Sequence, residues 1–139
     1  MLDDICKASA NYRLEKAHNC LKAAETLLES GAYADSANRS YYCIFHAIRA
    51  VLITYGFSAK THSGIITEFR RRYIKTGLFP IEFSDMIGNA FEIRNDSDYE
   101  DFSTISESEA LQQIENAKLF LEAVKEFIDN LPEDKQCQD

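Results

Sequence analysis

The segment YADSANRSYYCIFHAIRAVLITYG, residues 33–56, decides the fold class. Its apolar residues recur every three or four positions, which is the spacing of one face of an α-helix and not the alternation of a strand. The glycine at its end, Gly56, is typical of a helix C-terminus. The segment therefore predicts a helix whose apolar stripe carries Tyr41, Phe45, Ile48, Leu52 and Tyr55.

The chain upstream of this segment predicts another long helix. Alanines and leucines follow helical spacing over roughly residues 4–30, and Gly31 supplies a stop before the next helix begins. The apolar stripe of this first helix carries Ala17, Leu21, Ala24 and Leu28.

Three further helices are predicted downstream. A short helix follows KTHSG and extends to Gly77, and a fourth begins near Pro80, because proline suits the first turn of a helix. The last helix starts at a capping box, Ser106 to Glu109, and runs until Pro132. Their apolar stripes carry Ile65, Ile66, Phe69 and Tyr73; Phe83, Ile87 and Ala90; and Leu111, Ile114, Ala117, Leu121, Val124 and Ile128.

The composition agrees with a helical chain. Only five glycines and two prolines occur among 139 residues, and no segment alternates as a strand does. Short connections place neighbouring helices antiparallel, and a chain of this length is normally one domain. We predict an all-α, antiparallel up-and-down bundle of about five helices, with one helical domain over residues 1–131 and a flexible C-terminal tail over residues 132–139.

The sequence predicts a cytoplasmic protein that does not span a membrane. Its longest apolar run is interrupted by His46 and Arg49, which a lipid-facing helix rarely tolerates. The acidic start lacks the apolar core of a signal peptide. The four cysteines are scattered without the spacing of a zinc site, so we expect four reduced thiols, no metal and no cofactor.

The net charge of -8 argues against DNA as a ligand, because phosphate affinity comes mainly from lysine and arginine. Any contact with RNA must therefore be local. The one basic cluster, EFRRRYIK at residues 68–75, is typical of a solvated helix face, while the acidic remainder of the chain suits a basic protein partner.

The stretch EIRNDSDYEDF, residues 92–102, places one arginine among five carboxylates. The periodicity of the fourth helix puts Arg94 at the next inward position after Ala90, with Asp98 one turn further on. A guanidinium that is at least half-buried must keep a partner, since it cannot lose its charge. One interpretation is purely structural: Arg94 and Asp98 form an ion pair that fixes a dimer.

A polar stripe runs along the central helix beside its apolar stripe. Such a stripe either faces solvent or lines a groove between helices, and its aromatic residues and histidine favour the groove. His46 is then either a satisfied, half-buried histidine or a catalytic group. His62 either caps the third helix through its ring or serves the same groove. The stripe comprises Asp35, Arg39, Tyr42, His46 and Arg49.

Several common catalytic motifs are missing from the sequence. It has no phosphate-binding glycine loop, no HExxH and no GxSxG, so nucleotide hydrolysis, zinc proteolysis and serine esterase chemistry lack support. The carboxylates near Arg94 have no positioned partner that would separate acid–base catalysis from surface charge.

Four segments, GAYADSANRSYYCIFHAIRAVL, KTHSG, FRRRYIKTG and EIRNDSDY, resemble in order the landmarks of the HEPN family (higher eukaryote and prokaryote nucleotide-binding). The chain is most similar to the short stand-alone branch of that family, from the first helix to about residue 128. The resemblance implies a helical bundle, usually a homodimer, often encoded beside a minimal nucleotidyltransferase and acting with it as a toxin–antitoxin pair. The pattern rests on Arg39, Tyr41, Tyr42, Phe45 and His46, with a later Arg and Asp-Tyr.

The resemblance also implies a candidate active site. Active members are metal-independent ribonucleases whose motif is an arginine, a polar residue and, about four to six residues later, a histidine, drawn from both subunits into one cleft. Arg94 and Asn95 match its opening, but Tyr99, Glu100 and Asp101 stand where the histidine could fall. Cleavage through a 2′-hydroxyl requires a group that titrates near neutrality, which tyrosine does not.

Two functional interpretations follow from the resemblance. The first is a ribonuclease toxin with a degenerate motif, in which Arg94 acts with Asn95, Asp98 and Tyr99, and His46 or His62 substitutes for the missing histidine. The second is a non-catalytic subunit that binds RNA or a nucleotide for a nucleotidyltransferase. Tyr99 is also a candidate for modification, because a nearby tyrosine is adenylylated in some paired members. The binding residues of the second interpretation are Arg39, Tyr42, His46, His62 and Arg94.

Overall fold

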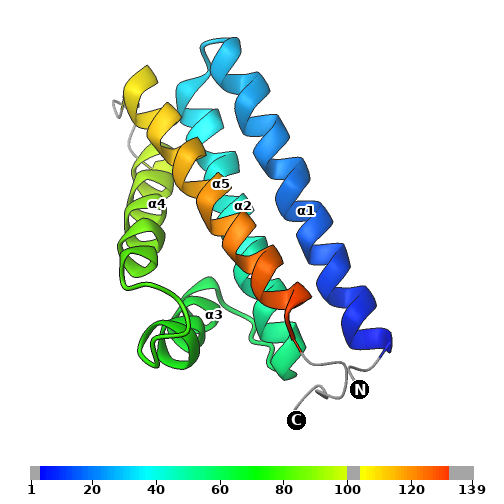
Figure 1. Cartoon of the computed structure of the whole chain (residues 1–139). Helices are drawn as coiled ribbons and strands as arrows, with labels where there is room; N and C mark the ends of the chain where they lie inside the picture. The colour runs from blue at the N-terminus through cyan, green and yellow to red at the C-terminus, as the bar shows by residue number, and fades with distance from the viewer. Residues whose placement is uncertain (1–3, 100–103, 132–139) are drawn as a thin grey trace.

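The computed structural model describes residues 4–99 and 104–131, the side chains of residues 96–99 excepted. Four long helices run up, down, up and down, and a short helical segment fills the connection between the second and the third of them (Figure 1). The predicted all-α, antiparallel bundle is therefore confirmed. The elements are α1 (Asp4–Glu29), α2 (Tyr33–Tyr55), α3 (His62–Phe69), the π-helical turn η1 (Arg70–Ile74), α4 (Glu82–Tyr99) and α5 (Glu107–Asp129).

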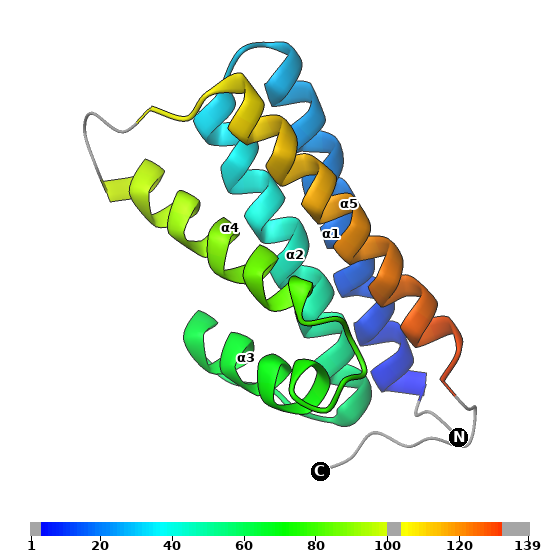
Figure 2. The same ribbon diagram turned by 60° about the vertical axis from the view of Figure 1, so that its left-hand side comes forward.

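Helix α2 is the centre of the bundle. It contacts α1, α3, α4 and α5, and Figure 2 shows it between α4 on one side and α1 and α5 on the other. More than half of its residues are buried, including Tyr41 and Ile48. A helix enclosed in this way has to be apolar on most of its circumference, which explains why its sequence decides the fold.

Helices α1 and α2 form a tight antiparallel hairpin. Ala10, Ala17 and Ala24 repeat every seven residues on α1 and are almost fully buried, so the two helices can approach closely. The Ser36 hydroxyl donates a hydrogen bond across the hairpin to the Ala24 carbonyl at 2.7 Å. Gly31 has a φ of 83° in the connecting turn, a conformation that favours glycine.

An aromatic cluster closes the other side of the bundle. The Phe120 ring of α5 stacks on Phe83 of α4, with centroids 5.0 Å apart, and lies 5.7 Å from the ring of Phe69 in α3. Phe79, in the turn after η1, lies 5.4 Å from Phe69 and 5.2 Å from Phe127. These rings attach the α3–η1 segment to α4 and α5.

The predicted boundaries agree with the observed ones to within a few residues, and one feature, the end of the third helix, differs from expectation. The capping box forms as predicted, because the Ser106 hydroxyl accepts from the Glu109 N–H and the Glu109 carboxylate accepts from the Ser106 N–H. Helix α4 starts two residues after Pro80. The third helix does not continue as an α-helix: from Arg70 it is a π-turn, in which the Lys75 N–H donates to the Arg70 carbonyl at 2.8 Å.

Cysteine chemistry is partly as expected. Cys20 and Cys43 are free thiols, whereas Cys6 is engaged in a disulfide, so the expectation of four reduced cysteines is wrong for Cys6. Cys137 lies outside the described residues. Within residues 4–99 and 104–131, no helix is long and apolar enough to cross a membrane.

We predict that Phe120→Ala lowers the free energy of unfolding by about 3–5 kcal/mol, because it removes a fully buried ring and leaves a cavity between three helices. Chemical denaturation followed by far-UV circular dichroism measures the change. The neighbouring Leu119, 54% exposed, is the control, and Leu119→Ala should change stability by no more than about 0.5 kcal/mol. Similar losses in both variants would contradict the described packing.

Candidate functional site

Arg94 anchors the last turns of α4 to α2. It follows Phe83, Ile87 and Ala90 on the inward face of α4, and it is half-buried as its position predicts. Its Nη2 donates a hydrogen bond to the Tyr42 Oη at 3.0 Å. Its guanidinium carbon lies 5.3 Å from the Tyr41 ring centroid and 5.5 Å from that of Tyr42, both within cation–π range.

His62, the first residue of α3, meets the same pair of tyrosines from another side. Its Nδ1 lies 2.8 Å from the Tyr41 Oη, and its ring stacks on Phe45 with centroids 4.0 Å apart. Either the tyrosine hydroxyl or the ring N–H donates in this bond, depending on the tautomer. Burial raises the pKa of Tyr41 to about 12, so its hydroxyl keeps its proton at neutral pH.

A second histidine, His46, lies one turn after Tyr42 on α2 and contacts both Tyr42 and α1. Its Nδ1 lies 3.4 Å from Nη1 of Arg13, which comes from α1. The ring is half-buried and tilts against Tyr42 at a centroid distance of 6.3 Å. Helices α1, α2, α3 and α4 thus each contribute a nitrogen-bearing side chain to one region of the surface.

Two further arginines of α2 lie against the same aromatic rings. The Arg39 guanidinium is 4.9 Å from the Tyr42 ring centroid, and that of Arg49 is 5.9 Å from the Phe45 centroid. We call the whole group the arginine–aromatic cluster: Arg13, Arg39, Tyr41, Tyr42, Phe45, His46, Arg49, His62 and Arg94.

The arginine–aromatic cluster is strongly cationic. Among the described residues, no carboxylate forms an ion pair with Arg13, Arg39 or Arg49. Burial and the charge of Arg13 lower the pKa of Arg49 from its usual value, which is a sign of like-charge repulsion. An anion placed here would relieve that repulsion, although the whole chain carries a net charge of -8.

Both histidines are held in their neutral form near pH 7. Burial first, and then the charges of Arg13, Lys16, Arg49 and Arg39, lower the pKa of His46 to about 4. Burial, Arg94 and Arg49 lower the pKa of His62. A neutral imidazole is the form that accepts a proton, so each ring is in the protonation state of a general base.

The structure brings together five of the side chains that the sequence singled out: Arg39, Tyr42, His46, His62 and Arg94. Asn95 is half-buried beside Arg94 and makes no hydrogen bond to a described side chain. The side chains of Asp98 and Tyr99 lie outside the described residues, so their predicted roles remain predictions.

One alternative for His62 is wrong. The N-cap of α3 is Thr61, whose hydroxyl accepts from the Gly64 N–H at 3.0 Å, and the imidazole turns inward to Tyr41 and Phe45. Threonine is the better cap because its short side chain reaches back to the free N–H groups of the first turn.

Sequence reasoning missed Arg13. It lies between Ala10 and Ala17 on the inward stripe of α1, three residues after one and four before the other. The periodicity that placed Arg94 inward would also have found Arg13, since both are arginines at positions where a hydrophobic residue is expected.

Comparison with known proteins places these residues in a family. Residues 10–127 match the HEPN domain. The chain belongs to the HEPN domain family. The matched range contains every member of the arginine–aromatic cluster, so this cluster is part of the HEPN domain itself.

Curated relatives cover most of the chain. A UPF0332 protein of Thermotoga maritima is 32% identical over 120 residues, which span 86% of this chain and 91% of that protein. The protein named "Putative toxin MJ0142" of Methanocaldococcus jannaschii is 31% identical over 115 residues, spanning 83% of this chain and 78% of its own length. "Putative toxin MJ0605" of the same organism is 31% identical over 116 residues, 83% and 85% of the two chains.

The HEPN domain has no metal-binding group among its described residues. No set of three or more His, Cys, Asp or Glu side chains comes together there in a way that could hold a metal ion. The arginine–aromatic cluster itself offers guanidinium, imidazole and phenol groups.

We predict that His46 makes the HEPN domain less stable in acid. Its pKa is about 6.5 when unfolded and about 4 when folded, so below pH 6.5 the unfolded chain takes up a proton that the folded chain does not. The contribution is present above pH 6.5 and is lost as the pH falls toward 4. After allowance for the solvent at this half-buried ring, it amounts to about 1–2 kcal/mol.

Denaturant titrations of wild type and His46→Gln at pH 7 and pH 4.5 measure this contribution. The variant should lose less stability between the two pH values than wild type does. His18, exposed on α1, provides the control, and His18→Gln should keep the wild-type difference. An unchanged difference in His46→Gln would show that this ring does not carry the effect.

Proposed function

We propose that this chain is the HEPN component of a toxin–antitoxin module, of ribonuclease-toxin lineage, and that its arginine–aromatic cluster binds the phosphates of RNA. The proposal is supported by the family membership and by the relatives named as toxins. The observation that carries the RNA-binding part is the cluster itself: four arginines around two neutral histidines, with no carboxylate paired to Arg13, Arg39 or Arg49 among the described residues.

The aromatic residues favour a nucleic acid over a small anion. Tyr42 lies beside Arg39 and Arg94, and single-stranded RNA is bound by combining cationic groups for its phosphates with ring faces for its bases. Tyr42 is half-buried, so part of it is accessible. Because the chain is acidic overall, this local group of charges has to supply the attraction.

The same residues include a candidate base and a candidate group for stabilising charge in RNA cleavage. A base removes the proton of the 2′-hydroxyl, the 2′-oxygen attacks the phosphorus, and the bond from phosphorus to the 5′-oxygen breaks as the protonated base returns that proton to the leaving oxygen. Arg94 would stabilise the negative charge that develops on the phosphoryl oxygens. His62 is the candidate base, because its Nδ1 bonds to Tyr41, on whose ring Arg94 lies, and its Nε2 makes no hydrogen bond to a described residue.

A second candidate function is supported by one feature of the sequence. After Arg94 and Asn95 the chain reads Asp96 to Asp101 without a histidine, so the family motif is incomplete. A chain of this kind could bind RNA or a nucleotide without cleaving it, as the binding subunit of a minimal nucleotidyltransferase. Both candidates include a homodimer, and both share the arginine–aromatic cluster as the binding site.

We predict that the purified protein binds a short single-stranded RNA and that Arg94→Ala weakens this binding about tenfold, since a hydrogen bond from a charged donor contributes about 1.5–3 kcal/mol. Fluorescence anisotropy measures the affinity. Arg71→Ala, which removes an exposed arginine of η1, should bind as wild type does. Equal binding by wild type and Arg94→Ala would contradict the proposal.

Cleavage of the same RNA distinguishes the two candidates. A toxin should cut the strand without added metal, and His62→Gln should slow cutting about 100-fold while binding stays within about threefold of wild type. A binding subunit should hold the RNA intact, and it should co-purify with the nucleotidyltransferase encoded beside it. If the RNA stayed intact and no nucleotidyltransferase gene lay beside this one, both candidate functions would be contradicted.

A further inference from the structure

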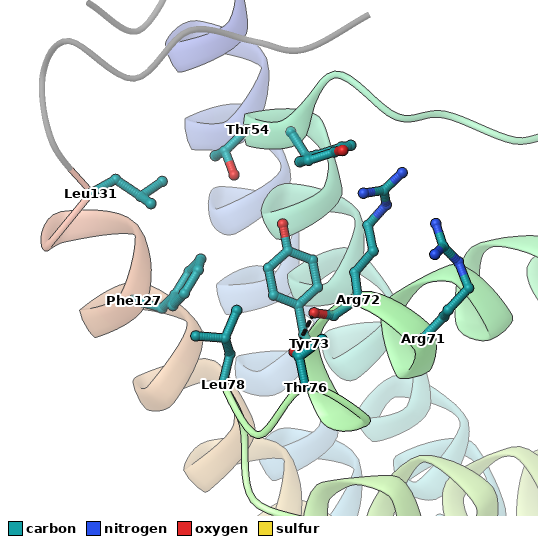
Figure 3. A pocket seen from close by; sticks show the side chains of 9 residues that line it. Thr54, Arg71, Arg72, Tyr73, Thr76, Leu78, Phe127 and Leu131 are labelled. Atoms are coloured by element: carbon teal, nitrogen blue, oxygen red, sulfur yellow. Dashed lines mark hydrogen bonds between the residues drawn. The ribbon is translucent and has the colours of Figure 1, made fainter.

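A cavity of about 300 Å³ lies at the end of α2 farthest from Tyr41. Its walls come from three elements: the last residues of α2, the η1 segment with its following turn, and the end of α5 (Figure 3). The volume is at the lower end of the range for small-molecule sites. It is lined by Thr54, Tyr55, Arg71, Arg72, Tyr73, Thr76, Leu78, Phe127 and Leu131.

One side of the cavity is apolar and the other is cationic. In Figure 3 the Tyr73 ring stands between Phe127, Leu131 and Leu78 on one side and Arg72 on the other. Leu78 is 59% exposed, so its side chain is accessible at the edge of the cavity. The Arg72 guanidinium lies 3.6 Å from the Tyr55 ring centroid, so the cationic side is also held in place by packing.

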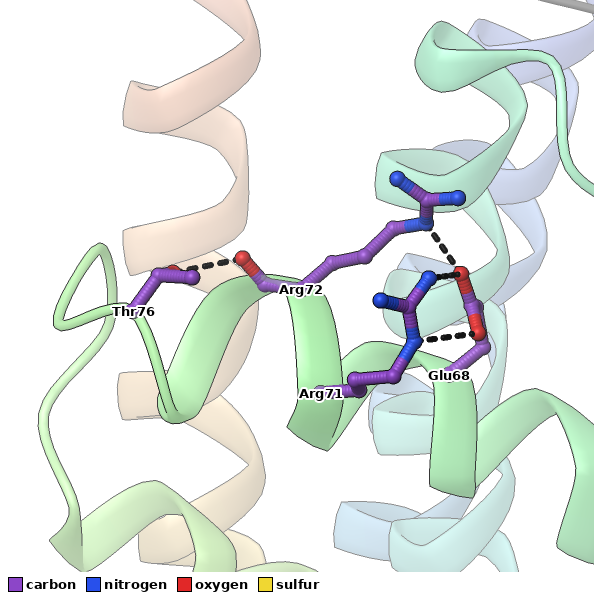
Figure 4. A network of polar contacts seen from close by, with 4 residues as sticks. All are labelled: Glu68, Arg71, Arg72 and Thr76. Atoms are coloured by element: carbon purple, nitrogen blue, oxygen red, sulfur yellow. Dashed lines mark hydrogen bonds and ion pairs between the residues drawn. The ribbon is translucent and has the colours of Figure 1, made fainter.

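The arginines on the cationic side carry one more positive charge than their bound carboxylate neutralises. Figure 4 shows that Arg71 and Arg72 both bind the carboxylate of Glu68, Arg71 through two hydrogen bonds of 3.1 and 2.7 Å. Two guanidinium groups thus share a single negative charge. The remaining positive charge lies at the rim of the cavity, where 58% of the Arg71 side chain is exposed.

The donors of the cavity lining that could reach a ligand are its guanidinium and phenol groups, because the threonine hydroxyls have already used their only hydrogen. The hydroxyls of Thr54 and Thr76 already donate to the carbonyls of Val51 and Arg72. Burial raises the pKa of Tyr73 to about 12, so its hydroxyl keeps its proton. Guanidinium and phenol donors match a group that only accepts hydrogen bonds, such as a carboxylate or a phosphate.

The backbone supplies an independent indication of a functional site. Arg71, Arg72 and Tyr73 all belong to the π-turn η1. Such turns are rare, and they occur frequently at functional sites.

The geometry points to a binding site for a small amphipathic anion, with an apolar body against Leu78, Phe127 and Leu131 and one carboxylate or phosphate at Arg71 and Arg72. This site is separate from the arginine–aromatic cluster. Tyr55 comes fourteen positions after Tyr41 on α2, a distance of about 20 Å along a helix. Neither site shares a residue with the other.

Octanoate is the probe that tests the proposal, with acetate as the anion without an apolar body and 1-octanol as the apolar body without a charge. Titration calorimetry on the full chain should give saturable one-to-one binding of octanoate, and at least tenfold weaker binding of acetate and of 1-octanol. Octanol that binds as tightly as octanoate would overturn the proposal, because the carboxylate, and hence its contact with the arginines, would then contribute nothing to the affinity.

Two surface substitutions locate the binding. Arg71→Gln and Leu78→Asp should each weaken octanoate about three- to tenfold, since one removes a charged donor and the other places a like charge on the apolar side. Both residues are exposed, and unchanged melting curves would show that both variants fold. The matched controls are Lys118→Gln, at an exposed ion pair with Glu25, and Leu119→Asp on the outside of α5.

The controls should bind octanoate as wild type does. Equal weakening by the controls, or no weakening by Arg71→Gln and Leu78→Asp, would overturn the proposal. Failure here would leave the RNA-binding function untouched, because no RNA-binding residue is changed.

Discussion

The bundle depends on one constraint: α2 has to contact every other helix. Helices α1, α3, α4 and α5 cover most of its circumference, and Arg39, Tyr42, His46 and Arg49 lie on the remaining strip. Apolar residues cannot be replaced on the covered faces without loss of packing, but this strip is not bound by that requirement. The arginine–aromatic cluster is thus built largely on the central helix of the bundle, whose packing helps to fix these side chains relative to one another.

The charges of the domain divide into a global and a local part. A net charge of -8 repels nucleic acid at long range, and four arginines attract phosphate over a few ångströms. Arg94 and Arg13 occupy inward positions of α4 and α1, where a hydrophobic residue would be buried without the free-energy cost of removing a charge from water.

Sequence periodicity predicted most of the fold and a good part of the site. The helices, the capping box and the inward position of Arg94 all follow from local rules of spacing and capping. The π-turn at Arg70 could not be predicted from the sequence. An extra residue in a helical turn depends on the packing of Phe69, Tyr73 and Phe79, and it does not change the local spacing of apolar residues. The contact between His62 and Tyr41 was also beyond reach, since it joins residues from two helices whose relative placement only the tertiary structure sets.

The salt dependence of RNA affinity tests the central claim most directly, because it counts the phosphates that the protein neutralises. For single-stranded RNA, each neutralised phosphate contributes about 0.7 to the slope of log affinity against log salt. A variant with Arg39, Arg49 and Arg94 changed to glutamine should therefore show a slope smaller by about 2 than wild type. An unchanged slope would contradict the account, because the phosphates would then be bound elsewhere on the molecule.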